Sequence, residues 1–137
     1  RFVRRGAPLV GVICDSARLG EGSRGVRFTV RWRGKLASAF AIRYQGRVYA
    51  YLNRCAHRQV ELDWDPGAFF TTDGASLICA THGARYAPDT GRCLDGPCGR
   101  SGLMALPVSE QDGQIRLGPG DELHLSAEPL PPAGNSP

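Results

Sequence analysis

The sequence of 137 residues lacks any apolar stretch near the roughly 20 consecutive residues that a membrane-spanning helix needs. The apolar segment from Leu9 to Cys14 ends at Asp15, and it is too short for the apolar core of a secretory signal. The pair Arg4-Arg5 also occurs in twin-arginine export signals, but no adequate apolar stretch follows it here. We therefore expect a cytoplasmic protein with no membrane partner.

Lysine is almost absent, because Lys35 is the only one among the 17 Lys and Arg residues. The net charge is +4, and the arginines are spread from Arg1 to Arg116 without a basic cluster interleaved with aromatic residues. A nucleic-acid-binding face requires such a cluster. The mild positive charge therefore predicts no nucleic-acid partner, whereas it is compatible with an acidic protein partner.

No apolar stripe at helical spacing persists for three turns anywhere in the sequence. Between Gly25 and Leu52 apolar and polar residues alternate instead, and tight turns are expected at Arg33-Gly34 and Gln45-Gly46. The segment 47–52 is apolar on both faces after its first residue, so it is expected to lie centrally in a sheet. Asp112-Gly113 predicts a further hairpin. The fold class is therefore all-β, with mainly antiparallel strands.

The five cysteines are an odd number in a chain long enough to bury a core without disulfide bonds. A secreted disulfide framework is therefore not expected. Two of the cysteines lie close to histidines in two short stretches, Cys55 with His57 and Cys79 with His82. Each stretch follows a predicted strand, and Gly83 behind the second histidine lets the backbone approach a bulky group closely.

Two thiolates and two imidazoles fit two kinds of metal site. A structural zinc ion binds such ligands in a tetrahedron, but its commonest layout groups the cysteines in one half of the motif and the histidines in the other. Here each half holds one of each. A [2Fe-2S] cluster with cysteines on one iron and histidines on the other explains the mixed halves, because each loop then crosses both irons. The sequence favours the cluster and leaves zinc as the alternative.

The pattern Cys55-Ala56-His57 followed by Cys79-Ala80-Thr81-His82-Gly83 resembles the ligand loops of the Rieske iron–sulfur family. Gly96-Pro97 resembles the proline-bearing loop that covers the cluster in that family. The resemblance extends from about Leu9 to Leu117. It implies a Rieske-like antiparallel β sandwich or barrel base with a small inserted cluster-binding subdomain, and one [2Fe-2S] cluster per chain.

The resemblance also implies a domain layout. Residues 1–125 would form a single Rieske-type domain, with the cluster-binding subdomain at about 53–102. Residues 126–137 are rich in proline and are expected to form a disordered tail. The segment 63–74, between the two ligand motifs, is expected to form an enlarged loop whose role the sequence does not indicate.

The resemblance implies a role for each residue of the site. Cys55 and Cys79 would bind the buried iron, and His57 and His82 the outer iron near solvent. Four further residues would surround the cluster without binding it: Tyr86, Gly83, Gly96 and Pro97.

Departures from the family pattern indicate a low-potential type of site. Rieske proteins of respiratory complexes carry a disulfide bond across the cluster, and its positions correspond to Val60 and Thr81 here, so that bond is absent. Those relatives also place a serine and a tyrosine where their hydroxyls donate hydrogen bonds to cluster sulfur; here the positions hold Ala84 and Tyr86. Losing a donor lowers the potential, so we expect roughly −150 to 0 mV.

Cys93 and Cys98 flank the Gly96-Pro97 loop, where they could pair with each other or bind metal. Because the cluster already has its ligands and the compartment is expected to be reducing, we expect both to be reduced packing residues. Near the ligands, Arg54, Arg58 and Arg85 either form a positive rim for an acidic redox partner or merely reflect the abundance of arginine. The sequence leaves these two interpretations equal.

We therefore expect a soluble ferredoxin-type carrier that passes single electrons from a reductase to a terminal oxygenase or another redox protein, with no catalysis of its own. The alternative is a small or regulatory subunit of a larger oxidoreductase. Outside the ligand motifs only His124 remains, so the chain lacks the 2-His-1-carboxylate iron site of a full oxygenase. A structural zinc module is the less favoured third hypothesis.

Overall fold

Antiparallel strands dominate the computed structural model, which describes residues 11–22, 24–55, 60–63, 65–81, 83–98, 101–118 and 123–126. The strands are β1 (Val12–Asp15), β2 (Val26–Trp32), β3 (Lys35–Tyr44), β4 (Arg47–Leu52), β5 (Leu77–Ile78), β6 (Arg85–Tyr86), β7 (Cys93–Asp95), β8 (Ala105–Leu106), β9 (Val108–Gln111), β10 (Gln114–Leu117) and β11 (Leu123–Ser126). A single-turn 3₁₀-helix, η1 (Ser16–Arg18), is the only helix within these ranges, and it is far too short to cross a membrane. The expected all-β class is confirmed.

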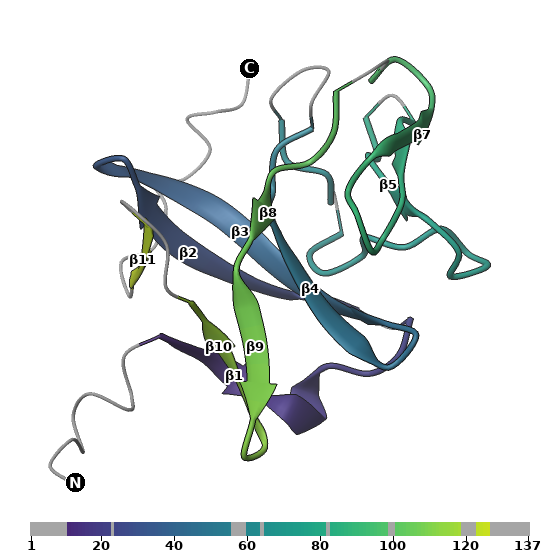
Figure 1. Cartoon of the computed structure of the whole chain (residues 1–137). Coiled ribbons are helices and arrows are strands. Elements are labelled where there is room, and N and C mark those ends of the chain that lie inside the picture. Colours follow the sequence, from purple (N-terminus) through teal and green to yellow (C-terminus); the bar gives the residue numbers. More distant parts are fainter. Residues whose placement is uncertain are drawn as a thin grey trace, which may run out of the picture.

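The strands form three sheets. The central sheet has the order β11-β2-β3-β4-β8, and two smaller sheets have the orders β1-β10-β9 and β5-β6-β7. In Figure 1 the sheet with β5 and β7 lies above and to one side of the central sheet, and the sheet with β1, β10 and β9 lies below it. This is the antiparallel base with a smaller added unit that the sequence predicts.

Three two-residue turns connect the longer strands. Both residues of each turn have positive φ, as a type I′ hairpin turn requires. The pairs are Arg33-Gly34 (52° and 79°), Gln45-Gly46 (52° and 81°) and Asp112-Gly113 (54° and 75°). All three turns were expected from the sequence, and the strands they join pair without a register shift.

The strand β3 is covered on both faces, and this arrangement positions the site. Its side chains alternate, so that Ala37, Ala39 and Ala41 point to one side while Phe40 and Ile42 point to the other. All five are buried. The next strand, β4, lies between β3 and β8 and is also buried on both faces towards its end, which confirms its predicted central position.

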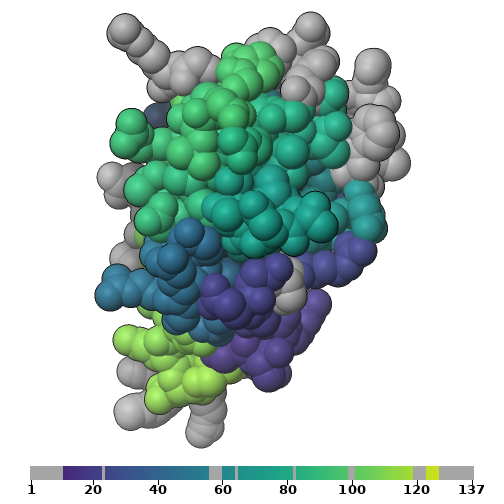
Figure 2. Space-filling model, turned by 90° about the vertical axis from the view of Figure 1, so that its right-hand side faces the viewer, coloured from purple at the N-terminus to yellow at the C-terminus, as the bar shows by residue number. Residues whose placement is uncertain are grey.

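Two hydrophobic cores lie on the two sides of the central sheet. The base core packs that sheet against β1-β10-β9, and it includes Cys14, Val30 and Ile115. The second core, called the loop core here, lies on the other side and holds both predicted cysteine ligands. Its buried members are Phe40, Ile42, Tyr51, Cys55, Leu62, Phe69, Leu77, Cys79, Ala84, Tyr86, Cys98 and Leu103. Figure 2 shows the corresponding teal and green segments gathered on the upper half of the molecule.

The C-terminal end differs from the expectation at one residue. Ser126, expected to begin the tail, pairs with Thr29 as the last residue of β11. Residues 127–137 lie outside the described part of the chain. His124 on the same strand is exposed, as the sequence predicts for a residue outside the site.

Candidate metal centre

Two equivalent loops begin at Cys55 and Cys79. The backbone N–H of Cys55 donates to the carbonyl of Val60 at 2.7 Å, and that of Cys79 donates to the carbonyl of Ala84 at 2.9 Å. Each loop is therefore closed by the same hydrogen bond, from its cysteine to the fifth residue after it. The N–H of Ala80 also donates to the carbonyl of Leu62 at 2.9 Å, which joins the two loops.

Both cysteines point into the protein. Cys55 and Cys79 are 0% exposed, lie in the loop core and form no disulfide bond. Their two companion histidines, His57 and His82, lie outside the described residues. No group of three or more His, Cys, Asp or Glu side chains converges in the part of the chain that is described. The structure therefore brings two of the four predicted ligands into one buried cluster.

Tyr86 lies directly behind the first cysteine. Its hydroxyl oxygen is 3.2 Å from the Sγ atom of Cys55, and its side chain is 0% exposed. A phenol next to a thiolate donates its proton to the sulfur, and such a charge-assisted bond stabilises the anionic sulfur. The second hydroxyl donor of the family pattern is a serine, and its position here holds Ala84, which is buried and has no hydroxyl.

Gly83 allows the sharp turn of the second loop. Its φ is +76°, and its N–H donates to the carbonyl of Cys79 at 2.9 Å. A Cβ at this position would meet no protein atom within 4 Å. The glycine is therefore needed for its backbone conformation, since no protein group crowds it.

The Gly96-Pro97 loop packs on the second ligand loop. A Cβ at Gly96 would lie 2.8 Å from the Cα of Ala84, so only glycine allows this backbone contact. Pro97 beside it is exposed. The loop thus lies against the segment that follows Cys79.

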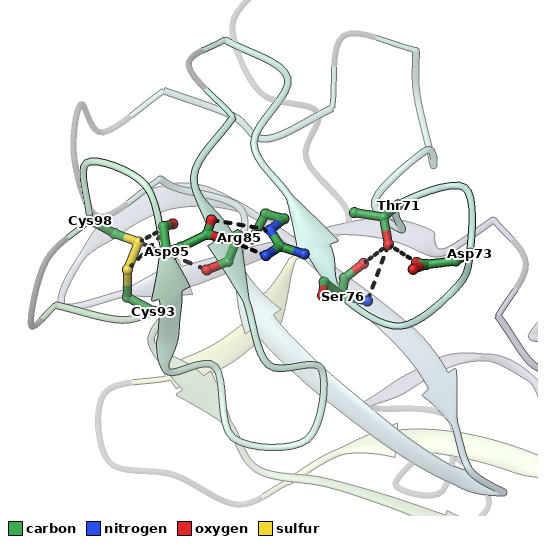
Figure 3. A network of polar contacts seen from close by, with 7 residues as sticks. All are labelled: Thr71, Asp73, Ser76, Arg85, Cys93, Asp95 and Cys98. Carbon is green, nitrogen blue, oxygen red and sulfur yellow. Dashed lines mark hydrogen bonds and ion pairs between the residues drawn. A yellow bond between two sulfur atoms is a disulfide. The ribbon is translucent and has the colours of Figure 1, made fainter.

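The expectation of reduced Cys93 and Cys98 is wrong. The two residues form a disulfide bond, with their Cα atoms 5.8 Å apart and five positions apart in sequence (Figure 3). The Gly96-Pro97 turn reverses the chain after β7 and brings Cys98 next to Cys93. The pairing alternative is the one that the structure contains.

Arg85 does not present an unpaired positive charge beside the site. Its Nε lies 3.1 and 3.2 Å from the two carboxylate oxygens of Asp95, and its Nη2 also contacts that carboxylate (Figure 3). The hydrogen bond from Arg85 lowers the pKa of Asp95, and the same bond raises the pKa of Arg85. Arg58 lies outside the described residues, and Arg54 is exposed. The positive rim is therefore reduced by this ion pair.

Asn53 and Asp63 clamp the two ends of the first ligand loop. The Nδ2 of Asn53 donates to Oδ1 of Asp63 at 3.0 Å, and Oδ1 of Asn53 accepts the N–H of Leu62 at 2.8 Å. Asp63, with its side chain 0% exposed, also accepts the N–H of Gly67 at 2.8 Å and lies 3.5 Å from Nε of Arg27. The clamp could not be predicted from the sequence, because Asn and Asp are ordinary turn residues.

The enlarged loop docks the ligand loops onto the central sheet. Phe69 is 0% exposed, and its ring stacks on Phe40 of β3 with centroids 3.9 Å apart. Gly25 donates its N–H to the carbonyl of Gly67 at 2.8 Å. At the far end of the loop, Thr71 Oγ1 donates to Asp73 at 2.6 Å (Figure 3). The loop therefore fastens the loop core to the start of β2 and to β3.

Tyr51 fixes the turn that leads into β7. Its hydroxyl donates to the carbonyl of Pro88 at 2.7 Å, and burial raises its pKa well above the usual value. Gly91, at the end of this turn, lies so close to the Tyr51 ring that a Cβ would come within 2.8 Å of it. The direction of β7 thus depends on a residue of the central sheet.

The donor set fits a thiolate-bound metal group. Two sulfurs are buried at the starts of equivalent loops, and a buried phenol is aimed at one of them. Burying thiolates without a metal or a positive partner would be unfavourable. The arrangement therefore suits a metal group that neutralises the thiolates.

A family model described as "Rieske [2Fe-2S] domain" matches residues 10–116 of the chain. A search of curated proteins finds no match.

Solved structures with a similar fold include two ferredoxins and one oxygenase. The ferredoxin of carbazole 1,9a-dioxygenase from Nocardioides aromaticivorans IC177 is 23% identical, with TM-score 0.64, covering 81% of this chain and 98% of that one. The Sphingomonas yanoikuyae B1 ferredoxin is 21% identical, with TM-score 0.62, covering 80% and 97%. The terminal oxygenase of the Nocardioides enzyme is 25% identical, with TM-score 0.62, covering 91% of this chain but 34% of that one.

Proposed function

Since the chain belongs to the Rieske [2Fe-2S] domain family, we propose that it carries single electrons between a reductase and a terminal oxygenase or a similar oxidoreductase. The observation that carries this proposal is the pair of buried cysteines, Cys55 and Cys79, at the starts of two equivalent loops. The cofactor is a [2Fe-2S] cluster, which when bound supplies one-electron transfer.

Cys55 and Cys79 bind one iron in this proposal, and His57 and His82 bind the other. The burial of the cysteines supports their place on the inner side. Tyr86 donates its hydrogen bond to Cys55, while Gly83 and the Gly96-Pro97 loop shape the backbone around the site. Residues of about 53–102 would then form the cluster-binding subdomain, held on the base by Phe69 and by the Asn53–Asp63 clamp.

A ferredoxin-type carrier is favoured by what the matched structures contain. Nearly the whole of the Nocardioides ferredoxin, 98% of its chain, aligns with this protein. One of the matched ferredoxin chains comes from a complex of reduced oxygenase and oxidized ferredoxin in carbazole 1,9a-dioxygenase. A terminal oxygenase is therefore the partner class that we propose, with a cytoplasmic site of action.

The second candidate function is that of a small or regulatory subunit of a larger oxidoreductase. The chain also aligns with 34% of a terminal oxygenase. A carrier would purify alone and be reoxidised by an added oxygenase, whereas a subunit would copurify in fixed ratio with a larger protein. Size-exclusion chromatography of the protein from its native source separates these outcomes.

The low-potential part of the Rieske range also belongs to this proposal. With Ala84 in place of a hydroxyl donor and Tyr86 as the remaining one, we expect a midpoint potential of roughly −150 to 0 mV. A spectroscopic redox titration that counts one electron per chain, followed by electron transfer to a purified terminal oxygenase, tests the function. A protein that takes up no electron in this range contradicts it.

A further inference from the structure

The disulfide bond closes the loop that covers the second ligand loop. Cys93 is the first residue of β7, and Cys98 follows Gly96-Pro97 (Figure 3). Gly96 in turn lies against Ala84, the residue whose carbonyl closes the loop of Cys79. The covalent bond therefore restrains a segment that packs against the second ligand loop of the candidate metal centre.

The two sulfurs differ in their access to solvent. Cys98 is 4% exposed and belongs to the loop core. Cys93 is half-buried, and it lines a cavity of about 430 Å³ together with Thr90, Arg92, Ser101 and Leu103. Cys93 is therefore the more accessible of the two cysteines to a nucleophile.

The cavity has the size and lining for a small anionic molecule. Its volume falls in the usual range for small-ligand sites, roughly 300–1,000 Å³. Arg92 supplies a positive charge, and Thr90 and Ser101 supply hydroxyl groups. We propose that this cavity admits a low-molecular-weight thiol bearing carboxylates, which exchanges with the disulfide at Cys93 and so releases the Gly96-Pro97 loop.

The exchange balances as follows. The thiolate of the small thiol attacks Sγ of Cys93, the Cys93–Cys98 bond breaks, and its electron pair leaves with Sγ of Cys98, which takes a proton from water. A second molecule of the thiol attacks the mixed disulfide and displaces Cys93 as a thiol. Two thiols are thereby oxidised to one external disulfide, and the protein disulfide is reduced to two thiols.

The surroundings of Cys98 accept the reduced form. Its Sγ lies 3.4 Å from the carbonyl oxygen of Asp95 and 3.8 Å from that of Arg85. Both neighbours are acceptors, so they favour a protonated thiol that donates to them over a thiolate. Protonation at this buried site prevents Cys98 from immediately attacking the mixed disulfide, because only the thiolate is a nucleophile.

After reduction of the disulfide, the Gly96-Pro97 loop is held by non-covalent contacts alone. Without the disulfide, the described restraints on this turn include the Arg85–Asp95 ion pair, the contact of Gly96 with Ala84, the pairing of β7 with β6, and the hydrogen bond from the N–H of Ser101 to the carbonyl of Cys98 at 2.9 Å. The ion pair is exposed and therefore contributes little. A disulfide bond between cysteines five positions apart reduces the number of conformations available to the open loop by a factor of up to about thirty. Reduction of the disulfide therefore increases the population of the open loop by at most that factor.

Reduced glutathione is the probe for the first test. The protein with its metal bound is incubated anaerobically with glutathione, quenched with an alkylating agent, and analysed by peptide mass spectrometry. We expect glutathione on Cys93, the alkyl group on Cys98, and neither on buried Cys14. An adduct on Cys98, an unreacted disulfide, or reduction only by a protein dithiol such as thioredoxin would each overturn the proposal.

Arg92→Gln tests the contribution of charge at the cavity. Because Arg92 is exposed at the cavity, this variant is expected to fold, and it should react about threefold more slowly with glutathione at low salt. With the uncharged thiol 2-mercaptoethanol the two proteins should react alike. Equal rates with glutathione would remove the anionic thiol from the proposal.

The consequence for the metal centre rests on the proposed function and is measured separately. Iron release to a chelator should be about tenfold faster after glutathione treatment, within the limit set by loop closure. The double variant Cys93→Ser/Cys98→Ser, treated alike, controls for direct action of the thiol on the metal and should release iron fast with or without glutathione. Equal release before and after reduction overturns the loop-release step. A preparation without iron contradicts the proposed function. The glutathione adduct on Cys93 can still be measured in that preparation, so the exchange reaction is tested separately.

Discussion

The hydroxyl of Tyr86 lies 3.2 Å from the sulfur of Cys55, and both side chains are completely buried. A hydrogen bond to sulfur is stronger when the sulfur carries more negative charge. Reduction of a bound cluster increases that charge, so this bond stabilises the reduced state more than the oxidised one. We therefore expect Tyr86 to raise the reduction potential above the value that the site would have without it.

Tyr86→Phe removes the hydroxyl and keeps the buried ring. If the bond differs by about 1 kcal/mol between the two redox states, the potential should fall by about 40 mV. A spectroscopic redox titration measures this shift. The control is Tyr44→Phe, since the hydroxyl of Tyr44 contacts exposed Gln45 rather than a sulfur. An unchanged potential in folded Tyr86→Phe would show that the bond is equally strong in both states.

Ala84→Ser should shift the potential in the opposite direction. Ala84 is buried, and its carbonyl accepts the N–H of Cys79, so a hydroxyl placed here lies beside the second ligand loop. Donation of this hydroxyl to cluster sulfur should raise the potential by about 40 mV, and Ala84→Val should not. A lower potential in the serine variant would mean that its hydroxyl points away from the sulfur.

Asn53→Ala should destabilise the first ligand loop. The change leaves the N–H of Leu62 without its side-chain acceptor and removes a donor from the buried carboxylate of Asp63. Such unsatisfied buried groups together cost about 2–3 kcal/mol of the free energy of unfolding, measurable by denaturant titration. The control is Gln111→Ala, because the side chain of Gln111 is exposed and makes no hydrogen bond with the described residues. A loss below about 0.5 kcal/mol would contradict the role of the clamp.

The Arg43–Glu110 pair should make stability depend on acid pH. Arg43 donates to both carboxylate oxygens of Glu110, at 3.0 and 2.6 Å. These bonds lower the pKa of Glu110 from 4.5 to about 2. Because the folded-state pKa is the lower one, the stabilisation is complete above about pH 4.5 and is lost as the pH falls towards 2.

Glu110→Gln isolates this contribution. At pH 6 the variant should be less stable than the native protein by about 1 kcal/mol, the upper end for a partly exposed ion pair. The difference should disappear as the pH approaches 2. Asp89→Asn, at an exposed turn, is the matched control. A difference that stays constant across this range would assign the effect to lost packing rather than to charge.

Local features of the fold could be predicted from the sequence, and long-range ones could not. The turns at Gln45-Gly46 and Asp112-Gly113 depend on the chemistry of adjacent residues, so the pattern was sufficient for them. The strands β6 and β8 have two residues each, which is too short for any periodicity to appear. They form only because their partners in the sheet are held in place by other parts of the chain.

The residues of the site divide in the same way, into those that local sequence predicts and those that depend on long-range contacts. Cys55 and Cys79 could be proposed as ligands because ligand type and spacing are local properties of the sequence, and the structure buries both in the loop core. The pairing of Asn53 with Asp63 and of Cys93 with Cys98 depends on how intervening loops return. The cysteines of the second pair were expected to be reduced because of the cellular compartment, but the return of the chain at Gly96-Pro97 places them within bonding distance.

Metal analysis combined with electron paramagnetic resonance of the reduced protein tests the central claim most directly. The account predicts two irons and two sulfides per chain, visible absorption, and a low-temperature signal from one unpaired electron. Cys79→Ser should abolish all of these, whereas Cys14→Ser, in the base core, should leave them unchanged. A colourless protein that contains one zinc ion per chain and gives no such signal would contradict the account.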